Sequence, residues 1–159
     1  MQEYFVYPTK FLHATNSLTD DQLAMIEPLA IGCHAVDRAD IKENDIVLVI
    51  GAGPIGLGTI QFAQLKGARV IAMDIDDAKL AKCKEITKVK DTINALGDVE
   101  EQLATLLNGD LPTIILDATG SPQSMMNTFK YAAAGGTIVF IGLFMVMLFF
   151  TIHLFIKKN

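Results

Sequence analysis

The sequence predicts an α/β fold, a doubly wound parallel sheet of about five strands with helices on both faces. Short apolar runs alternate with helix-length segments along residues 46–141. The first run is apolar at every position, as in strands that are covered on both faces, and a glycine-rich loop follows it. Strands that alternate with helices of ten or more residues form parallel sheets with right-handed crossovers. We expect the strand order 3-2-1-4-5.

The segment before the first strand is expected to hold an extended stretch and a helix. Residues 3–12 are rich in aromatic and β-branched residues, which favours an extended conformation. Asn, Ser and Thr precede two acidic residues within 16–21, a pattern typical of a helix start. A second start lies at Glu27-Pro28, because proline is tolerated at the first helical position. The helix should end near Ala39.

The remaining elements follow from apolar spacing. Leu80, Cys83 and Ile86 form one helical stripe, Gly67 is a helix stop and Ser121 a helix cap. The predicted strands are Ile46–Ile50, Val70–Met73, Asp91–Asn94, Thr113–Leu116 and Thr137–Ile141, and the predicted helices between them are Pro54–Lys66, Asp77–Ile86, Val99–Leu107 and Ser121–Ala134.

Length, hydrophobic content, net charge and cysteine spacing exclude several classes of protein. A chain of 159 residues, 51% of them hydrophobic, is long and apolar enough for one folded domain and excludes disorder. The net charge of −5 and the lack of a Lys/Arg run argue against a nucleic-acid partner. Cys33 and Cys83 form no CxxC pair, which excludes a zinc knuckle or disulfide scaffold and suits the reducing cytoplasm. No signal peptide is expected at residues 1–4.

The loop after the first strand carries a dinucleotide-binding fingerprint of the Rossmann type. It reads Gly51-Ala52-Gly53-Pro54-Ile55-Gly56. The first glycine permits a tight turn, the second lets a pyrophosphate approach the backbone, and the third allows close packing of helix on strand. The pyrophosphate would meet unpaired amides at a helix N-terminus. Asp74, which ends the second strand, can accept hydrogen bonds from the ribose diol and repels a 2′-phosphate, so NAD is predicted over NADP.

Three other interpretations share this loop. It could be a glycine-rich turn without a ligand, although the strand, helix and acid that accompany it argue against that. FAD enzymes carry a similar loop, usually near the start of the chain, whereas here a strand and a helix precede it. Methyltransferases use a glycine loop that lacks the Pro54-Ile55-Gly56 continuation.

Two ordered motifs resemble the zinc-dependent medium-chain alcohol dehydrogenases. The first is IEPLAIGCHAV at residues 26–36, and the second is VLVIGAGPIG at residues 47–56. The likeness covers about residues 3–143, includes DATG at 117–120, and is greatest for the sorbitol, polyol and sugar-acid dehydrogenase branch. It implies oxidation of a secondary alcohol of a polyol or sugar acid by hydride transfer to NAD. It also implies zinc as the Lewis acid and a homo-oligomer.

The resemblance assigns site residues position by position. A zinc or zinc-water role carries over to Glu27, for which helix capping is the alternative; His34 is expected in the core near the cofactor, and His13 and Cys33 are expected to be structural. The implied cofactor-binding residues are Gly51, Gly53, Pro54, Ile55 and Gly56 for the pyrophosphate, Asp74 and Lys79 for the ribose, and Ala118, Thr119, Ile141 and Gly142 for the nicotinamide end.

Other parts of the family pattern are missing, as in a protein truncated at both ends. Its catalytic domain, with the zinc-binding Cys, a His-Glu pair and a four-cysteine zinc lobe, has no counterpart here. We therefore expect residues 1–20 to be a remnant of that domain, 21–143 the NAD-binding domain and 144–159 an aberrant apolar tail. One oxygen ligand cannot hold zinc, which needs four donors. An inactive fragment that binds NAD is predicted; a non-catalytic NAD-binding module, a pseudogene product, or a chain completed by a separate catalytic subunit are the alternatives.

The C-terminal segment has two interpretations. Residues 137–156 are apolar over about the length of a bilayer span. The sheet needs 137–143 as a strand, however, and the remainder is too short to span, which makes a membrane anchor the weaker alternative. The other hypothesis is a frameshift, because one inserted base after the codon of Met145 can restore a family-like reading. A smaller departure occurs at 85–87, where the family has a helix-closing glycine.

Overall fold

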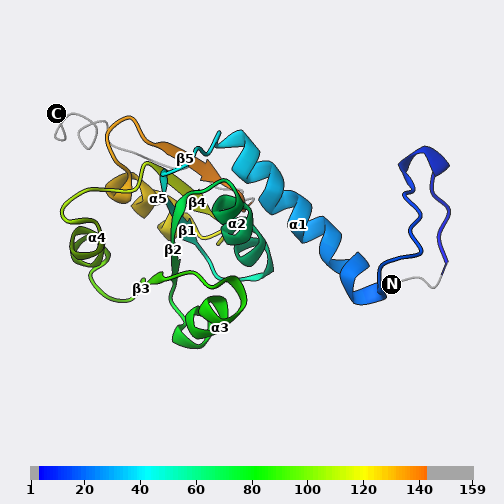
Figure 1. Ribbon diagram of the computed structural model, residues 1–159, viewed down its shortest axis with the longest axis horizontal. Coiled ribbons are helices and arrows are strands. Elements are labelled where there is room, and N and C mark those ends of the chain that lie inside the picture. Colours follow the sequence, from blue (N-terminus) through cyan, green and yellow to red (C-terminus); the bar gives the residue numbers. More distant parts are fainter. Residues whose placement is uncertain (1–3, 143–159) are drawn as a thin grey trace.

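The computed structural model describes residues 4–142 and shows a parallel sheet between two layers of helices (Figure 1). The strand order is β3-β2-β1-β4-β5, and each neighbouring pair is parallel, which confirms the predicted fold class and order. The strands are β1 Ile46–Ile50, β2 Arg69–Asp74, β3 Asp91–Asn94, β4 Ile114–Asp117 and β5 Thr137–Phe140; the helices are α1 Asp20–Arg38, α2 Pro54–Leu65, α3 Asp77–Thr87, α4 Val99–Leu107 and α5 Pro122–Tyr131.

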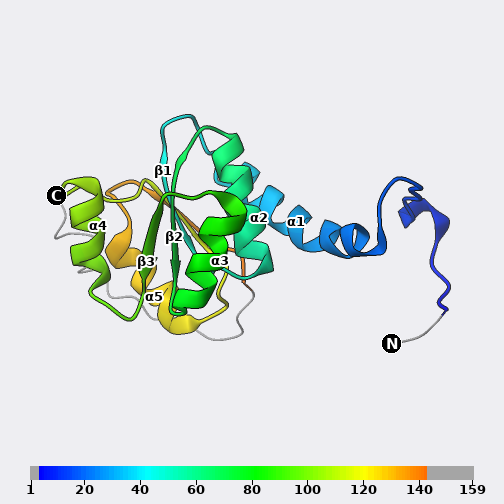
Figure 2. The same cartoon turned by 60° about the horizontal axis from the view of Figure 1, so that its bottom comes forward.

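The apolar strands separate two cores. Alternate side chains of a strand point to opposite faces, so Val47 and Val49 pack toward one layer and Leu48 and Ile50 toward the other. The first core contains residues of α1, α2 and α3, and the second contains residues of α4 and α5. Figure 2 shows α4 and α5 on one side of the sheet and α2 and α3 on the other. Both faces of the central strands are therefore buried, as their continuous apolar sequence predicts.

The segment before β1 differs from the prediction only in part. Residues 4–12 form no strand, and a short 3-10 helix, Thr9–Phe11, lies there instead. A single helix, α1, then begins at Asp20, because Thr19 and Gln22 form a reciprocal capping box. The expected second start at Glu27-Pro28 is wrong, since Pro28 lies inside α1. Figure 1 shows α1 projecting from the sheet, and the local signals for extension at 4–12 lack any neighbouring strand to pair with.

Two helix ends also differ in detail. α3 ends at Thr87, one residue beyond the predicted Ile86, and is closed by Lys88, which takes the left-handed conformation (φ +59°). α5 ends at Tyr131 rather than Ala134. Between residues 4 and 142, no helix is both long and apolar enough to cross a membrane. The hypotheses on the apolar tail concern residues outside the described range.

The contact between α1 and α2 depends on small side chains. A Cβ atom built on Gly32 of α1 would lie 2.9 Å from both the backbone nitrogen and Oγ1 of Thr59 in α2. A Cβ atom on Gly58 of α2 would lie 2.9 Å from Cδ2 of Leu29. The two helices thus approach each other more closely than any larger residue at these positions allows, and this contact anchors α1 to the helix that follows the glycine loop.

The Gly32→Ala substitution tests this packing, because helix propensity and overpacking change the free energy of unfolding in opposite directions. Alanine favours helix formation over glycine by about 1 kcal/mol, but overpacking of a tight contact costs about 1–3 kcal/mol. We expect the free energy of unfolding, measured by urea titration with circular dichroism, to fall by about 1–2 kcal/mol. Ala30→Ser, on the exposed side of α1, should change it by less than about 0.5 kcal/mol. A more stable Gly32→Ala variant would contradict the close contact.

Candidate cofactor-binding site

The glycine loop connects β1 to α2 through a turn that requires a positive φ at its first residue, a conformation that glycine adopts easily. Gly51 has φ +99°, and its backbone N–H donates to the carbonyl of Met73 at 2.7 Å. The first hydrogen bond of the α2 ladder runs from the Leu57 N–H to the Gly53 carbonyl at 2.8 Å. The amides of Ile55 and Gly56 therefore precede the ladder, and Pro54 has none. An anion placed at this end of α2 would meet these amides and the positive end of the helix dipole.

The second and third glycines of the motif meet different surroundings. A Cβ atom on Gly53 would have no atom within 4 Å, so the space beside it is open. A Cβ atom on Gly56 would lie 1.7 Å from the carbonyl oxygen of Gly51. The motif predicts that Gly56 allows close packing of helix on strand. The structure shows that it allows the first turn of α2 to pass the Gly51 carbonyl of the same loop.

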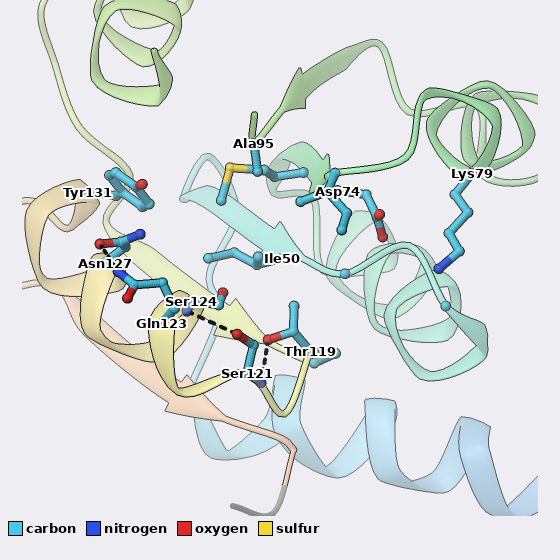
Figure 3. Close-up of a pocket in the computed structure, with 15 residues that line it drawn as sticks. Ile50, Asp74, Lys79, Ala95, Thr119, Ser121, Gln123, Ser124, Asn127 and Tyr131 are labelled. Carbon is cyan, nitrogen blue, oxygen red and sulfur yellow. Dashed lines mark hydrogen bonds between the residues drawn. The ribbon is translucent and has the colours of Figure 1, made fainter. Parts of the chain in front are cut away.

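Asp74 ends β2 beside this loop. Its side chain is almost completely buried, with 9% exposure. Oδ2 accepts a hydrogen bond from the Ala52 N–H at 2.7 Å, and Oδ1 accepts one from the Asp76 N–H at 3.0 Å. Figure 3 shows Asp74 and Lys79 at the same end of the pocket, with Lys79 reaching from α3 toward the loop. A negative and a positive side chain thus face one end of the cavity.

A pocket of about 480 Å³ opens at the carboxyl ends of β1, β2 and β4. The chain winds to β2 on one side of β1 and to β4 on the other, and ligands of open α/β sheets bind at such a switch point. Six of the predicted cofactor-binding residues line this pocket: Gly51, Gly53, Asp74, Lys79, Ala118 and Thr119. Five do not line it: Pro54, Ile55 and Gly56 continue into α2, and Ile141 and Gly142 follow β5.

One wall of the pocket was not predicted. It is formed by polar residues at and after the start of α5, namely Ser121, Gln123, Ser124, Asn127 and Tyr131. Their spacing of three and four residues puts Ser124, Asn127 and Tyr131 on one helix face. That spacing is visible in the sequence, but the residues that the family resemblance assigns to the site do not include these positions. Apolar side chains complete the lining: Ile50, Met73, Ile75 and Ala95.

Tyr131 lies at the inner end of this polar wall (Figure 3) and is 8% exposed. Burial raises the pKa of its phenol, and the carboxylates of Glu100 and Asp98 raise it further. The hydroxyl group therefore stays protonated at neutral pH. Tyr131 is a hydrogen-bond donor in the pocket and is not poised to act as a base.

Asp117, at the end of β4, organises the loop opposite the glycine motif. Its carboxylate is fully buried and accepts hydrogen bonds from the Thr119 N–H at 2.8 Å, the Thr119 hydroxyl at 2.6 Å and the Ser124 hydroxyl at 2.5 Å. Its backbone carbonyl accepts the N–H of Ile141 at 2.8 Å and that of Gly142 at 3.4 Å. Asp117 therefore connects the pocket wall at Thr119 and Ser124 to the predicted nicotinamide-end residues after β5.

The residues considered for metal binding are dispersed. Glu27 is exposed in the interior of α1, so the helix-capping alternative is wrong for it. His34 is also exposed, which corrects the expectation of a core histidine, and His13 is exposed in the N-terminal segment. Within residues 4–142, no three His, Cys, Asp or Glu side chains are grouped so that they could hold a metal ion. The described residues do not supply a zinc site.

Comparison with known proteins identifies relatives of one family. The model of the zinc-binding dehydrogenase family matches residues 54–159. L-galactonate-5-dehydrogenase of Escherichia coli K12 is 36% identical over 157 residues, which are 99% of this chain and 46% of the relative. Sorbitol dehydrogenase of Rattus norvegicus is 33% identical over 135 residues, 80% of this chain and 37% of the relative. The chain spans less than half the length of these relatives.

Solved structures show the same fold. One is described as a short chain alcohol dehydrogenase of Escherichia coli CFT073 complexed with NADH; it is 30% identical, with a TM-score of 0.79, over 91% of this chain and 43% of its own. Another is a zinc-binding dehydrogenase of Sinorhizobium meliloti 1021 bound to NADP, 28% identical with a TM-score of 0.74, over 82% of this chain and 40% of its own.

Ser124→Ala tests the role of the Asp117 carboxylate. The change removes one hydrogen-bond donor from a fully buried charged group, and a buried acceptor that loses its partner costs about 1–3 kcal/mol. We expect a decrease of that size in the free energy of unfolding, measured by urea titration. The control Ser17→Ala, in the exposed N-terminal segment, should change it by less than about 0.5 kcal/mol. Equal stabilities of the two variants would contradict the assigned network.

Proposed function

The chain belongs to the zinc-binding dehydrogenase family, and from this premise we propose that it binds NAD(H) at the carboxyl edge of its sheet. One observation carries the proposal. Gly51 and Gly53 of the loop that leads into α2 and the Asp74 carboxylate line a single pocket at the switch point of the sheet. Its volume of about 480 Å³ is within the range typical of small-molecule sites.

The surroundings suggest how the dinucleotide is oriented. The diphosphate fits the open space at Gly53, beside the amides of Ile55 and Gly56 that precede the hydrogen-bond ladder of α2. The adenosine ribose then lies at Asp74, and the adenine ring can enter the apolar part of the pocket beside Met73 and Ala95. The nicotinamide end extends in the other direction, toward Ile141 and Gly142 after β5. Bound there, the cofactor supplies an acceptor for a hydride.

We propose that the complete activity of this lineage is the oxidation of a secondary alcohol on a polyol or sugar acid. The names of the relatives support this substrate class, since one acts on L-galactonate and another on sorbitol. The described residues do not fit the zinc ion of the family, because no three potential ligands are grouped among them. We propose that this polypeptide by itself binds the cofactor without turning over a polyol.

The cofactor preference provides the first test. A carboxylate at position 74 accepts ribose hydroxyls and repels a 2′-phosphate, so NADH should bind at least about tenfold more tightly than NADPH. Calorimetry with both cofactors measures this ratio. Asp74→Ser should weaken NADH binding and bring the ratio close to one, whereas Asp110→Ser, an exposed change beyond α4, should leave both unchanged. A folded wild-type chain that shows no heat with NADH or ADP-ribose would refute the proposed function.

Turnover provides the second test. The purified chain is mixed with zinc, NAD and a panel of polyols and sugar acids, and NADH formation is followed by its absorbance. We expect no rate above that of the protein-free control, because a zinc-dependent alcohol oxidation needs a metal that polarises the alcohol oxygen. Measurable turnover that disappears with a chelator would show that the chain holds zinc and would overturn the inactive assignment, while leaving NAD binding intact.

A further inference from the structure

We propose that Asp74 has a second role: its carboxylate holds the glycine loop in the shape that binds a diphosphate. This inference rests on the proposed NAD(H) site and adds a function to a residue otherwise assigned only to the ribose. Two consecutive loop amides are tied to the end of β2. The Gly51 N–H donates to the Met73 carbonyl at 2.7 Å, and the Ala52 N–H donates to Asp74 Oδ2, also at 2.7 Å.

The Ala52 amide depends on this acceptor. Ala52 is 6% exposed, so water has little access to the residue, and buried amides need an acceptor within the protein. The bond also falls at the point where the chain leaves β1, directly after the left-handed turn at Gly51. Gly53 caps α2 without a side-chain hydrogen bond. Asp74 therefore takes part in fixing the chain immediately before the amides that face the diphosphate.

Asp74 can hold the Ala52 amide, an interaction that we call the brace, and contact the ribose at the same time. An ionised carboxylate has about four lone-pair directions, and the Ala52 and Asp76 amides use one on each oxygen. The remaining directions can receive the hydroxyl groups of a ribose. Asp74 thus joins the two halves of the adenosine diphosphate site, because one carboxylate positions the loop under the diphosphate and accepts the sugar beside it.

Inorganic pyrophosphate has no sugar, so its binding separates the proposed loop-holding role of Asp74 from the contact with ribose. On charge alone, Asp74 repels a diphosphate, so its neutralisation should strengthen binding of inorganic pyrophosphate. If Asp74 braces the loop, its replacement by asparagine leaves one acceptor oxygen for the Ala52 and Asp76 amides, and binding weakens because the anion must order the loosened loop itself. The two effects have opposite signs. A residue that only contacts ribose would not weaken pyrophosphate binding at all.

The experiment compares the wild type with Asp74→Asn. Asparagine offers one acceptor oxygen, so it cannot hold both the Ala52 and the Asp76 amides with oxygen atoms. Amide NMR titration with inorganic pyrophosphate should show binding at least about threefold weaker in Asp74→Asn. Hydrogen exchange at the Ala52 amide should also be faster in the ligand-free variant. Equal or tighter pyrophosphate binding, or unchanged exchange at Ala52, would overturn the brace.

Asp76→Asn is the matched control. Asp76 is exposed two residues away and caps α3 through the Ala78 and Lys79 amides, a task that asparagine also performs. The same charge is removed without touching the loop, so pyrophosphate should bind equally or more tightly. A weakening as large as that in Asp74→Asn would show that the effect does not require the Asp74–Ala52 hydrogen bond and would refute the brace. Failure of the wild type to bind NADH would refute the proposed function separately, since exchange at Ala52 is measured without ligand.

Discussion

The site depends on the hydrogen bonds that hold the end of β1 between its two neighbours. Beyond the regular strands, the Gly51 N–H donates to the Met73 carbonyl of β2 at 2.7 Å, and the Ala118 N–H donates to the Ile50 carbonyl of β1 at 2.9 Å. These bonds bring the loops after β1, β2 and β4 to one edge. After β1 the chain continues to β2 on one side of it and later to β4 on the other side. The loops that follow β1 and β4 therefore diverge, and the pocket lies between them.

The two strand-end aspartates serve this edge in the same way. Each accepts, through Oδ1, the backbone amide two residues later: Asp74 that of Asp76, and Asp117 that of Thr119. Each also uses its second oxygen for a distant partner, Ala52 for Asp74 and Ser124 for Asp117. A buried carboxylate is tolerable when amides and hydroxyls satisfy it. Side-chain carboxylates therefore help to fix the loops on both sides of the pocket.

The sequence predicted the parts of the molecule in which local pattern and packing agree. The apolar run of β1, the glycine loop and Asp74 each carry a local signal, and the topology rules for parallel sheets supplied the strand order that the structure confirms. The extended pattern at 4–12 formed no strand, because a strand needs another strand beside it, and Thr9–Phe11 turn into a short 3-10 helix. Glu27 failed as a helix cap because the reciprocal bonds of Thr19 and Gln22 begin α1 earlier.

The polar wall of α5 and the Asp117 network were not predicted for a different reason. Asn127 and Tyr131 are unremarkable residues of a helix, and only the tertiary arrangement turns their face toward Met73 and Ala95 of the pocket. Asp117 was visible as part of a motif, but its hydrogen-bond partners were not. They are Ser124, which lies 7 residues away in α5, and the amides of Ile141 and Gly142, which follow β5. Side-chain partnerships of this kind depend on the relative positions of elements, which local propensity does not encode.

Cofactor binding and metal chemistry make different physical demands on a chain. A diphosphate is held mainly by backbone amides, so three glycines at the right spacing, a helix start and one strand-end acid suffice. All of these lie within residues 51–74 and are positioned by the adjacent strands β1 and β2. A zinc ion instead needs several side chains to converge from separate segments, and no three candidates do so within the described residues. The two capabilities are independent in structural terms, and the described part of the chain has the arrangement that the first one requires.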